Sequence, residues 1–198
     1  CQDFPDIYHL QARWIAENVE KYNIRYVLHL GDVTNRNEPE QWTVAKEAME
    51  RLDGKVPYVM TVGNHDMGPN GSARNRKSLL SEYFPVAKFR KWETFGGVYD
   101  KEPEKLDNNY HLFEAGGRKW LALSLEFGPR HDVLRWANEL VREHADRSVI
   151  VTTHAYLTPR GRRFDRRLEK PQSAAPHRYG AASLPGGLNE GEELSLIH

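Results

Sequence analysis

Cysteine is almost absent from this chain of 198 residues, which carries a single one, Cys1. One thiol cannot form a disulfide within the chain, and it cannot build a cysteine-rich zinc site. No hydrophobic run approaches the ~20 residues that a membrane-spanning helix needs, so we expect no membrane span. There is also no net charge, with 28 Lys and Arg against 28 Asp and Glu. A general nucleic-acid-binding protein would usually carry a basic excess, so we expect no binding of that kind.

An initiating methionine is absent as well. The chain starts at Cys1 with a helical pattern close behind, and it ends in a predicted helix over Asn189–Leu196 with Asn189 as the N-cap. We therefore expect a fragment or a processed chain, in which residues 1–198 form a single, truncated domain. A signal peptide cannot be judged from such a start. The compartment stays open, with a secreted or periplasmic full-length parent as one alternative.

The most informative stretch of the sequence is a predicted strand followed at once by three polar side chains. Residues 56–62 form a short hydrophobic run with β-branched and aromatic members and no helical period, which predicts a β-strand. Gly63 ends it, and Asn64, His65 and Asp66 follow. Open α/β sheets place ligand sites at the C-terminal ends of their strands. Taken alone, the run is equally well explained as a turn in which Asn64 and Asp66 bond their own backbone.

Two further predicted strands end in the same way. Residues 24–30 are followed by Gly31 and Asp32, and residues 148–153 are followed by His154. Between the strands, helices are predicted over 40–52 and 133–143, and a β-hairpin is predicted from 109–115 and 119–127. Strand, helix and strand in succession favour an α/β fold with parallel connections. Three strands that each deliver a metal-competent side chain make a shared site a better interpretation than three turns.

The first helix is predicted over Pro5–Tyr22, and its hydrophobic residues are assigned to the core. Those residues recur at helical spacing, with charges between them. They are Ile7, Leu10, Trp14, Ile15 and Val19. His29 shares a strand face with Val27, and we interpret it as a hydrogen-bonded core histidine rather than a ligand.

In these motifs the chain resembles the calcineurin-like metallophosphoesterases, in particular a bacterial branch of that family. The family pattern includes Gly-Asp, then Gly-Asn-His-Asp or Glu, then a lone His. Gly31-Asp32, Gly63-Asn64-His65-Asp66 and His154 stand in that order here, beside phrases such as LHLGD and LSLEFGPR. The resemblance implies a layered α/β-β/α sandwich with mixed sheets inside and helices outside. It also implies a hydrolase for phosphate esters.

The resemblance further implies a site with two divalent or trivalent transition-metal ions. Asp32 would bridge them, Asn64 would supply an amide oxygen and His154 an imidazole nitrogen. Such mixed nitrogen and oxygen ligands suit Mn, Fe, Zn or Co better than Ca or Mg. Two ions would clamp the phosphoryl oxygens and acidify a water molecule. His65 would act on the leaving oxygen as a catalytic residue, with Asp66 orienting its imidazole.

Substrate contacts are expected from the irregular segment 158–187, which the resemblance places near the site. His177 and Tyr179 are the candidates there. The Arg74, Arg76 and Lys77 run could attract an anionic substrate, although a solvated charged face is the more common explanation of such a run. The substrate would be a small-molecule, lipid or nucleotide phosphate ester. The sequence does not separate phosphomonoesters from phosphodiesters, and the oligomeric state stays open.

Two ligand motifs of the family have no match in this chain. They are an upstream Asp-x-His or Asp-x-Gln and a terminal Gly-His-x-His. Three ligands shared by two metal ions make a poor site. We therefore expect the chain as it stands to be weakly active or inactive. A non-catalytic member of the same fold, acting as a ligand- or partner-binding module, remains the alternative function.

Overall fold

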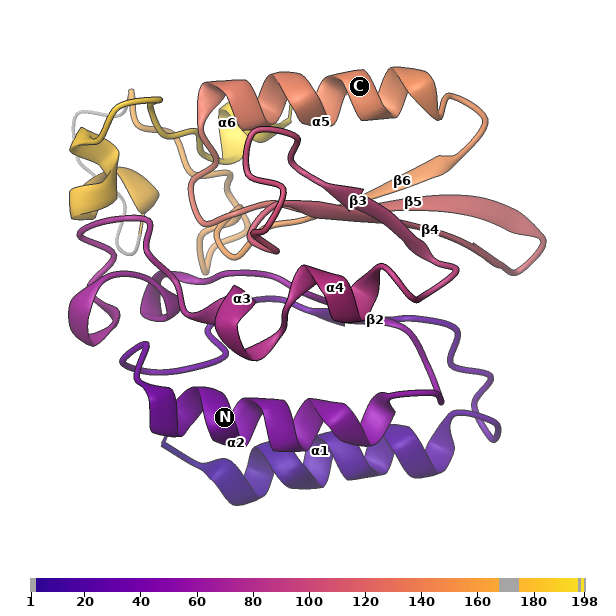
Figure 1. Cartoon of the computed structure of the whole chain (residues 1–198). Helices are drawn as coiled ribbons and strands as arrows, with labels where there is room; N and C mark the ends of the chain where they lie inside the picture. Colours follow the sequence, from indigo (N-terminus) through magenta and orange to yellow (C-terminus); the bar gives the residue numbers. More distant parts are fainter. Residues whose placement is uncertain (1–2, 168–174, 196, 198) are drawn as a thin grey trace.

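The computed structural model describes residues 3–167, 175–195 and 197 of the chain. Helices α1 and α2 form one outer layer, helix α5 forms the other, and two β-sheets lie between them (Figure 1). This order of layers is the α/β-β/α sandwich that the resemblance implied. None of the described helices combines the length and the hydrophobicity needed to cross a membrane.

The first sheet is a strand–helix–strand unit. It joins β1 (Val27–His29) to β2 (Tyr58–Met60) in parallel, through helix α2 (Pro39–Met49). β1 is shorter than the predicted strand for a structural reason. The Ile24 N–H donates to the Val19 carbonyl at 2.9 Å and so finishes the turn after α1.

The second sheet has four strands in the order β3-β4-β5-β6. β3 (Phe95–Val98), β4 (Asn109–Ala115) and β5 (Arg118–Ser124) are antiparallel, and β4 and β5 form the predicted hairpin. Helix α5 (His131–Glu143) then crosses to β6 (Ser148–Thr152), which runs parallel to β5. The mixed character of this sheet agrees with the expected fold.

A buried hydroxyl cluster joins the two sheets beside the C-terminal ends of their parallel strands. The Thr61 hydroxyl lies 2.9 Å from the Ser124 hydroxyl and donates to the Thr152 hydroxyl at 3.2 Å. Thr61 follows β2, whereas Ser124 and Thr152 end β5 and β6. Because buried hydroxyl groups need partners, these bonds fix how the strand ends meet. The polar residues that follow β2 and β6 are thereby brought to one place.

The remaining elements are short and lie in the connections. They are η1 (Glu50–Leu52), η2 (Asn64–Asp66), η3 (Pro69–Gly71), α3 (Leu80–Tyr83), α4 (Val86–Phe89), η4 (Pro176–Arg178), η5 (Gly180–Ser183) and α6 (Gly191–Leu194). The N-cap of α6 is Glu190 and not the predicted Asn189. The Asn189 amide donates instead to the Pro129 carbonyl at 2.8 Å. Leu196, the predicted end of that helix, lies outside the described residues.

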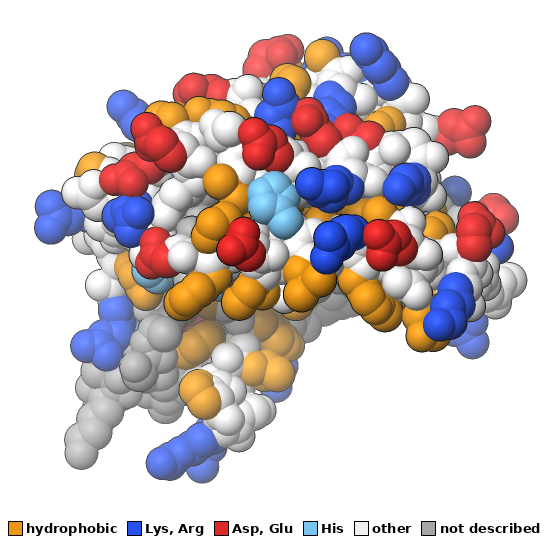
Figure 2. All heavy atoms as spheres, turned by 90° about the horizontal axis from the view of Figure 1, so that it is seen from below, with side chains coloured by type: hydrophobic (Ala, Val, Ile, Leu, Met, Phe, Trp, Pro, Cys, Tyr) orange, Lys and Arg blue, Asp and Glu red, His pale blue; other side chains and the backbone are white. Residues whose placement is uncertain are grey.

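The prediction for the first helix was right for Ile15 and Val19, which pack against the core, and wrong for Ile7, Leu10 and Trp14. Helix α1 (Pro5–Asn18) buries Tyr8 and Ala12, whereas Ile7, Leu10 and Trp14 are 49%, 53% and 50% exposed. Both sets recur at helical spacing, so periodicity alone cannot choose between two adjacent stripes. Tyr8 and Ala12 belong to the hydrophobic core, so the stripe that carries them faces inward. Seen from the side of helices α1 and α2, the surface shows hydrophobic side chains scattered among charged ones (Figure 2).

His111 is a buried titratable group between the sheets. Four aromatic rings lie near it, those of Tyr26, Phe89, Trp92 and Phe95. Neither of its ring nitrogens has a hydrogen-bond partner among the described residues. Burial lowers the pKa of His111 to about 3. The folded protein therefore holds this imidazole neutral.

This burial predicts a pH dependence of stability. The unfolded chain protonates His111 below its ordinary pKa of about 6.5, and the folded protein does so only near 3. The free energy of unfolding therefore does not depend on the titration of His111 above about pH 6.5, and it decreases as the pH falls below that value. Between about pH 6 and about pH 4.5 the wild type should lose about 2 kcal/mol more unfolding free energy than His111→Phe.

Urea unfolding at the two pH values measures this difference. All other titrating groups are shared by the two proteins, so their contributions cancel. Equal losses in the wild type and the variant would show that His111 is not held neutral in the fold.

Candidate functional site

The polar residues that follow three strands converge in the structure. Asp32 follows β1 and His154 follows β6, and the Asp32 carboxylate lies 3.1 Å from His154 Nε2. The second Asp32 oxygen accepts the His65 backbone N–H at 3.1 Å. Asn64, beside His65 in η2, lines a cavity of about 300 Å³ together with His154. The expectation that these strand ends meet is confirmed by this geometry.

Backbone conformation makes this close approach feasible. Gly31 and Asp32 both have left-handed backbone, with φ of 92° and 51°. A β-carbon on Gly63 would lie 2.2 Å from the Asp32 Oδ1 and 2.3 Å from the Asp32 nitrogen. Real β-carbons do not approach other atoms so closely. Only glycine at position 63 therefore allows the turn after β2 to touch the turn after β1.

Asp32 and His154 shift each other's pKa in the direction that favours the charged forms. Burial disfavours the charged form of each group, but their hydrogen bond and mutual attraction outweigh it. As a result the pKa of Asp32 lies below its ordinary value and the pKa of His154 lies above its own. His154 Nδ1 also lies 2.8 Å from the Leu30 carbonyl oxygen. That contact orients the ring so that Nε2 faces Asp32.

The donor set fits a transition-metal ion only in part. Asp32 would supply a carboxylate oxygen and His154 an imidazole nitrogen, both of which are transition-metal ligands, and these two atoms lie 3.1 Å apart. Asn64, which lines the same cavity as His154, carries an amide oxygen that could be a further donor. Among the described residues, however, no three His, Cys, Asp or Glu side chains gather in a metal-binding group. These three residues can therefore contribute to a metal site without completing one.

Asp66 does not have the contact that was expected of it. Its buried carboxylate accepts hydrogen bonds from Val33 N, Thr34 N, Thr34 Oγ1 and Gly63 N. His65 Nδ1 instead lies 2.9 Å from the Asn35 carbonyl oxygen. The structural reason is that Asp66 points under the loop after Asp32, where backbone N–H groups need acceptors. Burial raises its pKa to about 6, although the backbone N–H bonds oppose this shift. Asp66 therefore supports His65 indirectly, through the loop that carries Asn35.

The predicted substrate residues lie at the same end of the molecule. The Tyr179 ring packs edge-on against Phe127 at 5.2 Å, and Phe127 lies 6.2 Å from the His154 ring. Burial and the charge of Asp32 both raise the pKa of Tyr179. The Ala181 N–H donates to the Ala73 carbonyl at 2.8 Å, which ties this segment to the loop after β2. In Figure 1 the segment is gold, and it lies beside that loop.

His177 is held by a residue that the sequence did not single out. The Glu190 side chain is fully buried, and its Oε1 lies 2.6 Å from His177 Nδ1 and accepts the His177 backbone N–H at 2.7 Å. A carboxylate on Nδ1 leaves Nε2 as the ring atom available to other groups. The pair is separated by thirteen residues in sequence, and no local spacing indicates it.

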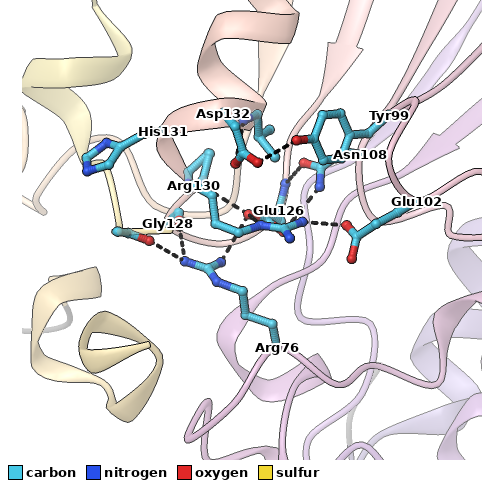
Figure 3. Close-up of polar contacts among 12 residues, drawn as sticks. Arg76, Tyr99, Glu102, Asn108, Glu126, Gly128, Arg130, His131 and Asp132 are labelled. Atoms are coloured by element: carbon cyan, nitrogen blue, oxygen red, sulfur yellow. Dashed lines mark hydrogen bonds and ion pairs between the residues drawn. The ribbon is translucent and has the colours of Figure 1, made fainter. Parts of the chain in front are cut away.

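The basic run after the Gly-Asn-His-Asp motif is not a solvated face at Arg76. Its guanidinium is largely buried and pairs with Glu126 at 3.2 Å. It also donates to the carbonyls of Phe127, Gly128 and Gly187. Figure 3 shows Arg130 on the same carboxylate, completing a buried ionic network. The sequence contained one indication of this network, since Glu126 stands between Leu and Phe in the phrase LSLEFGPR. Such a position predicts a buried carboxylate, and a buried carboxylate needs partners.

Comparison with known proteins identifies the family. The model of the calcineurin-like phosphoesterase family matches residues 3–178. The chain belongs to this family. It is also 32% identical over 166 residues to a protein of Bacillus subtilis (strain 168) with the printed name "Uncharacterized protein YvnB". That match covers 82% of this chain and 12% of the Bacillus protein. Family membership supports a general role in phosphoester hydrolysis, and members of the family typically bind divalent metals.

The contact at Gly63 gives a direct test of the site. Gly63→Ala should push Asp32 away from His154, and we expect at least a tenfold loss of Mn²⁺ affinity by titration calorimetry. That range is the usual cost of losing a residue that orients a metal ligand, about 10–100-fold.

Gly116→Ala serves as the control, because a β-carbon there would meet nothing within 4 Å. It carries only the cost of its positive φ, so it should bind Mn²⁺ like the wild type. Unchanged affinity in Gly63→Ala would contradict the crowding at Asp32.

Proposed function

We propose that this domain hydrolyses phosphate esters as a metal-dependent phosphatase or phosphodiesterase. The observation that carries the proposal is the convergence of Asp32, Asn64 and His154 at the ends of strands from both sheets. Carboxylate, amide and imidazole donors side by side suit Mn, Fe, Zn or Co. Two such ions, when bound, would neutralise the phosphoryl charge and lower the pKa of a water molecule.

The side chains of the site have distinct tasks in this proposal. Asp32 has two carboxylate oxygens and can contact two ions, whereas Asn64 and His154 each offer one donor atom. The Leu30 carbonyl holds the His154 ring in its binding orientation. Because Asp32 also accepts the His65 backbone N–H, the metal ligand and the catalytic candidate are joined through a single contact.

His65 is assigned to the proton that the leaving oxygen takes up. Its Nδ1 is occupied by the Asn35 carbonyl, which leaves Nε2 for the substrate. Asp66 keeps this arrangement by holding the loop 33–35 with hydrogen bonds to Val33 and Thr34. We therefore assign Asp66 a positioning role rather than direct contact with the His65 ring.

His177 and Tyr179 are assigned to substrate binding. Both come from the segment that packs over Phe127, beside His154. His177 Nε2 and the Tyr179 hydroxyl can bond the phosphoryl oxygens or the organic group of the ester. A small-molecule, lipid or nucleotide phosphate ester is the proposed class of substrate.

One observation favours a second candidate function. The described residues contain no group of three acidic, histidine or cysteine side chains that could hold a metal ion. A non-catalytic domain of the same fold would bind a ligand or partner through its long loops and would need no complete metal centre. Metal content and turnover, measured on the same protein, separate the two functions.

Two substitutions separate metal binding from proton transfer. In the natural full-length protein, Asp32→Ala should abolish metal binding and phosphoesterase activity together. His65→Ala should keep its metal and lose turnover by about 10²–10⁴-fold, the usual effect of removing a general acid–base group. Metal analysis of the purified variants and a chromogenic phosphodiester assay give the two readouts.

His144→Ala, at the end of the outer helix α5, is the matched control and should behave as the wild type in both assays. Equal loss of metal from the Asp32 and His65 variants would contradict the role of His65. Metal-loaded wild-type protein with no turnover on any phosphate ester would favour the binding module.

A further inference from the structure

The cavity beside the proposed metal ligands is polar on one side and mostly nonpolar on the other. One side is formed by Asn64 and His154. The rest of the lining is Ala155, Leu157, Thr158, Pro159 and Phe164. The volume is about 300 Å³, which is at the lower end of the range for small-molecule sites. The cavity therefore runs from the polar cluster directly onto a nonpolar wall.

The nonpolar wall is a preformed structure. Residues 157–163 turn back on themselves through a β-bridge between Leu157 and Arg163. Thr158 N donates to the Arg162 carbonyl at 2.7 Å, and Phe164 N donates to the Tyr156 carbonyl at 3.0 Å. Because backbone hydrogen bonds already hold this wall in place, a ligand does not have to order it on binding. Less binding free energy is therefore lost to the ordering of the loop.

The chemistry of the wall selects what can occupy it. Phe164 is buried at the base with 3% exposure, and Leu157 is 51% exposed at the rim. The Thr158 hydroxyl already accepts the Arg162 N–H at 3.2 Å. No Asp, Glu, Lys or Arg side chain lines this cavity in the described part of the chain. A charged group placed against Leu157, Pro159 and Phe164 would find no partner of opposite charge among them, whereas a hydrocarbon group there would be stabilised.

We propose that this cavity binds the organic group of the phosphoester and that the group is a nonpolar alkyl or aryl chain. Leu157, Pro159 and Phe164 are then the residues that determine specificity. This inference rests on the proposed hydrolase function, which places phosphorus beside Asp32, Asn64 and His154. In the reaction a water oxygen bonds to phosphorus, the bond from phosphorus to the ester oxygen breaks, and that oxygen takes a proton. The products are a phosphate and a nonpolar alcohol.

A series of substrates with growing chains tests the inference. Ethyl, butyl and hexyl phosphates, and their methyl diesters, have leaving alcohols of nearly equal acidity, so their intrinsic reactivity is nearly constant. In the full-length protein with Mn²⁺, kcat/KM should rise about fourfold for each methylene that enters the cavity. A flat series would overturn the proposal.

Substitution at the rim locates the effect. Leu157→Ser should remove most of the dependence on chain length, because a hydroxyl at the rim replaces nonpolar surface. Leu10→Ser is the matched control, since Leu10 is an equally exposed leucine on α1 and does not line the cavity. It should keep the wild-type slope. A slope that survives in Leu157→Ser would place the hydrocarbon chain elsewhere.

Binding without turnover separates this inference from the proposed function. Ethyl-, butyl- and hexylphosphonate cannot be hydrolysed, and their dissociation constants follow from titration calorimetry. The same fall of about fourfold per methylene is expected, with loss of the trend in Leu157→Ser. If no ester is hydrolysed but the trend in binding is present, the cavity assignment stands and the hydrolase function fails. If binding does not depend on chain length, the cavity assignment fails.

Discussion

The contact between Asp32 and His154 is the interaction on which the site depends, because it joins the two sheets. Asp32 belongs to the turn after β1 in the first sheet, and His154 follows β6 in the second. Each strand supplies only one of the two donors, so no local segment could build the pair. The hydroxyl cluster of Thr61, Ser124 and Thr152 holds the same sheets together a few residues away. Steric constraint adds to these polar contacts, since only glycine at position 63 leaves room for Asp32.

Buried carboxylates organise the loops around this contact. Asp66 collects the backbone N–H groups of the loop after β1, Glu126 pairs with Arg76 and Arg130, and Glu190 holds His177. A carboxylate is stable inside a protein only when charges or N–H donors surround it. Each one therefore imposes an arrangement on the segments that bring those donors. In this domain a few polar centres therefore hold the loops together with hydrophobic loop residues such as Val33, Met67 and Phe127, which are buried in the core.

The layout of the site follows from two different kinds of surface. On one side are the polar donors at the strand ends, and on the other is the mostly nonpolar wall formed by Ala155, Leu157, Thr158, Pro159 and Phe164. A phosphoester has the same two halves, a charged phosphoryl group and an organic group. The segment of His177 and Tyr179 closes the polar side through Phe127. In the function that we propose, the phosphoryl group lies at the polar side and the organic group at the nonpolar side.

The sequence by itself determined the main strands and helices and the order of the candidate ligands. Hydrophobic runs ending in Gly-Asp, Gly-Asn-His-Asp and His predicted strands with Asp32, Asn64 and His154 at their C-terminal ends. That step works because strand ends and turn residues are set by local backbone chemistry. The sequence did not determine which stripe of α1 is buried, since Tyr8 and Ala12 have the same helical period as the exposed Ile7 and Trp14.

Only the tertiary structure decided which polar groups meet. The partner of the His65 ring is the Asn35 carbonyl rather than Asp66, and Arg76 lies buried on Glu126 rather than in solvent. These partners are thirty and fifty residues apart in the chain. Their choice depends on how the two sheets and their loops pack, because each buried polar group takes a partner that packing brings within hydrogen-bond distance.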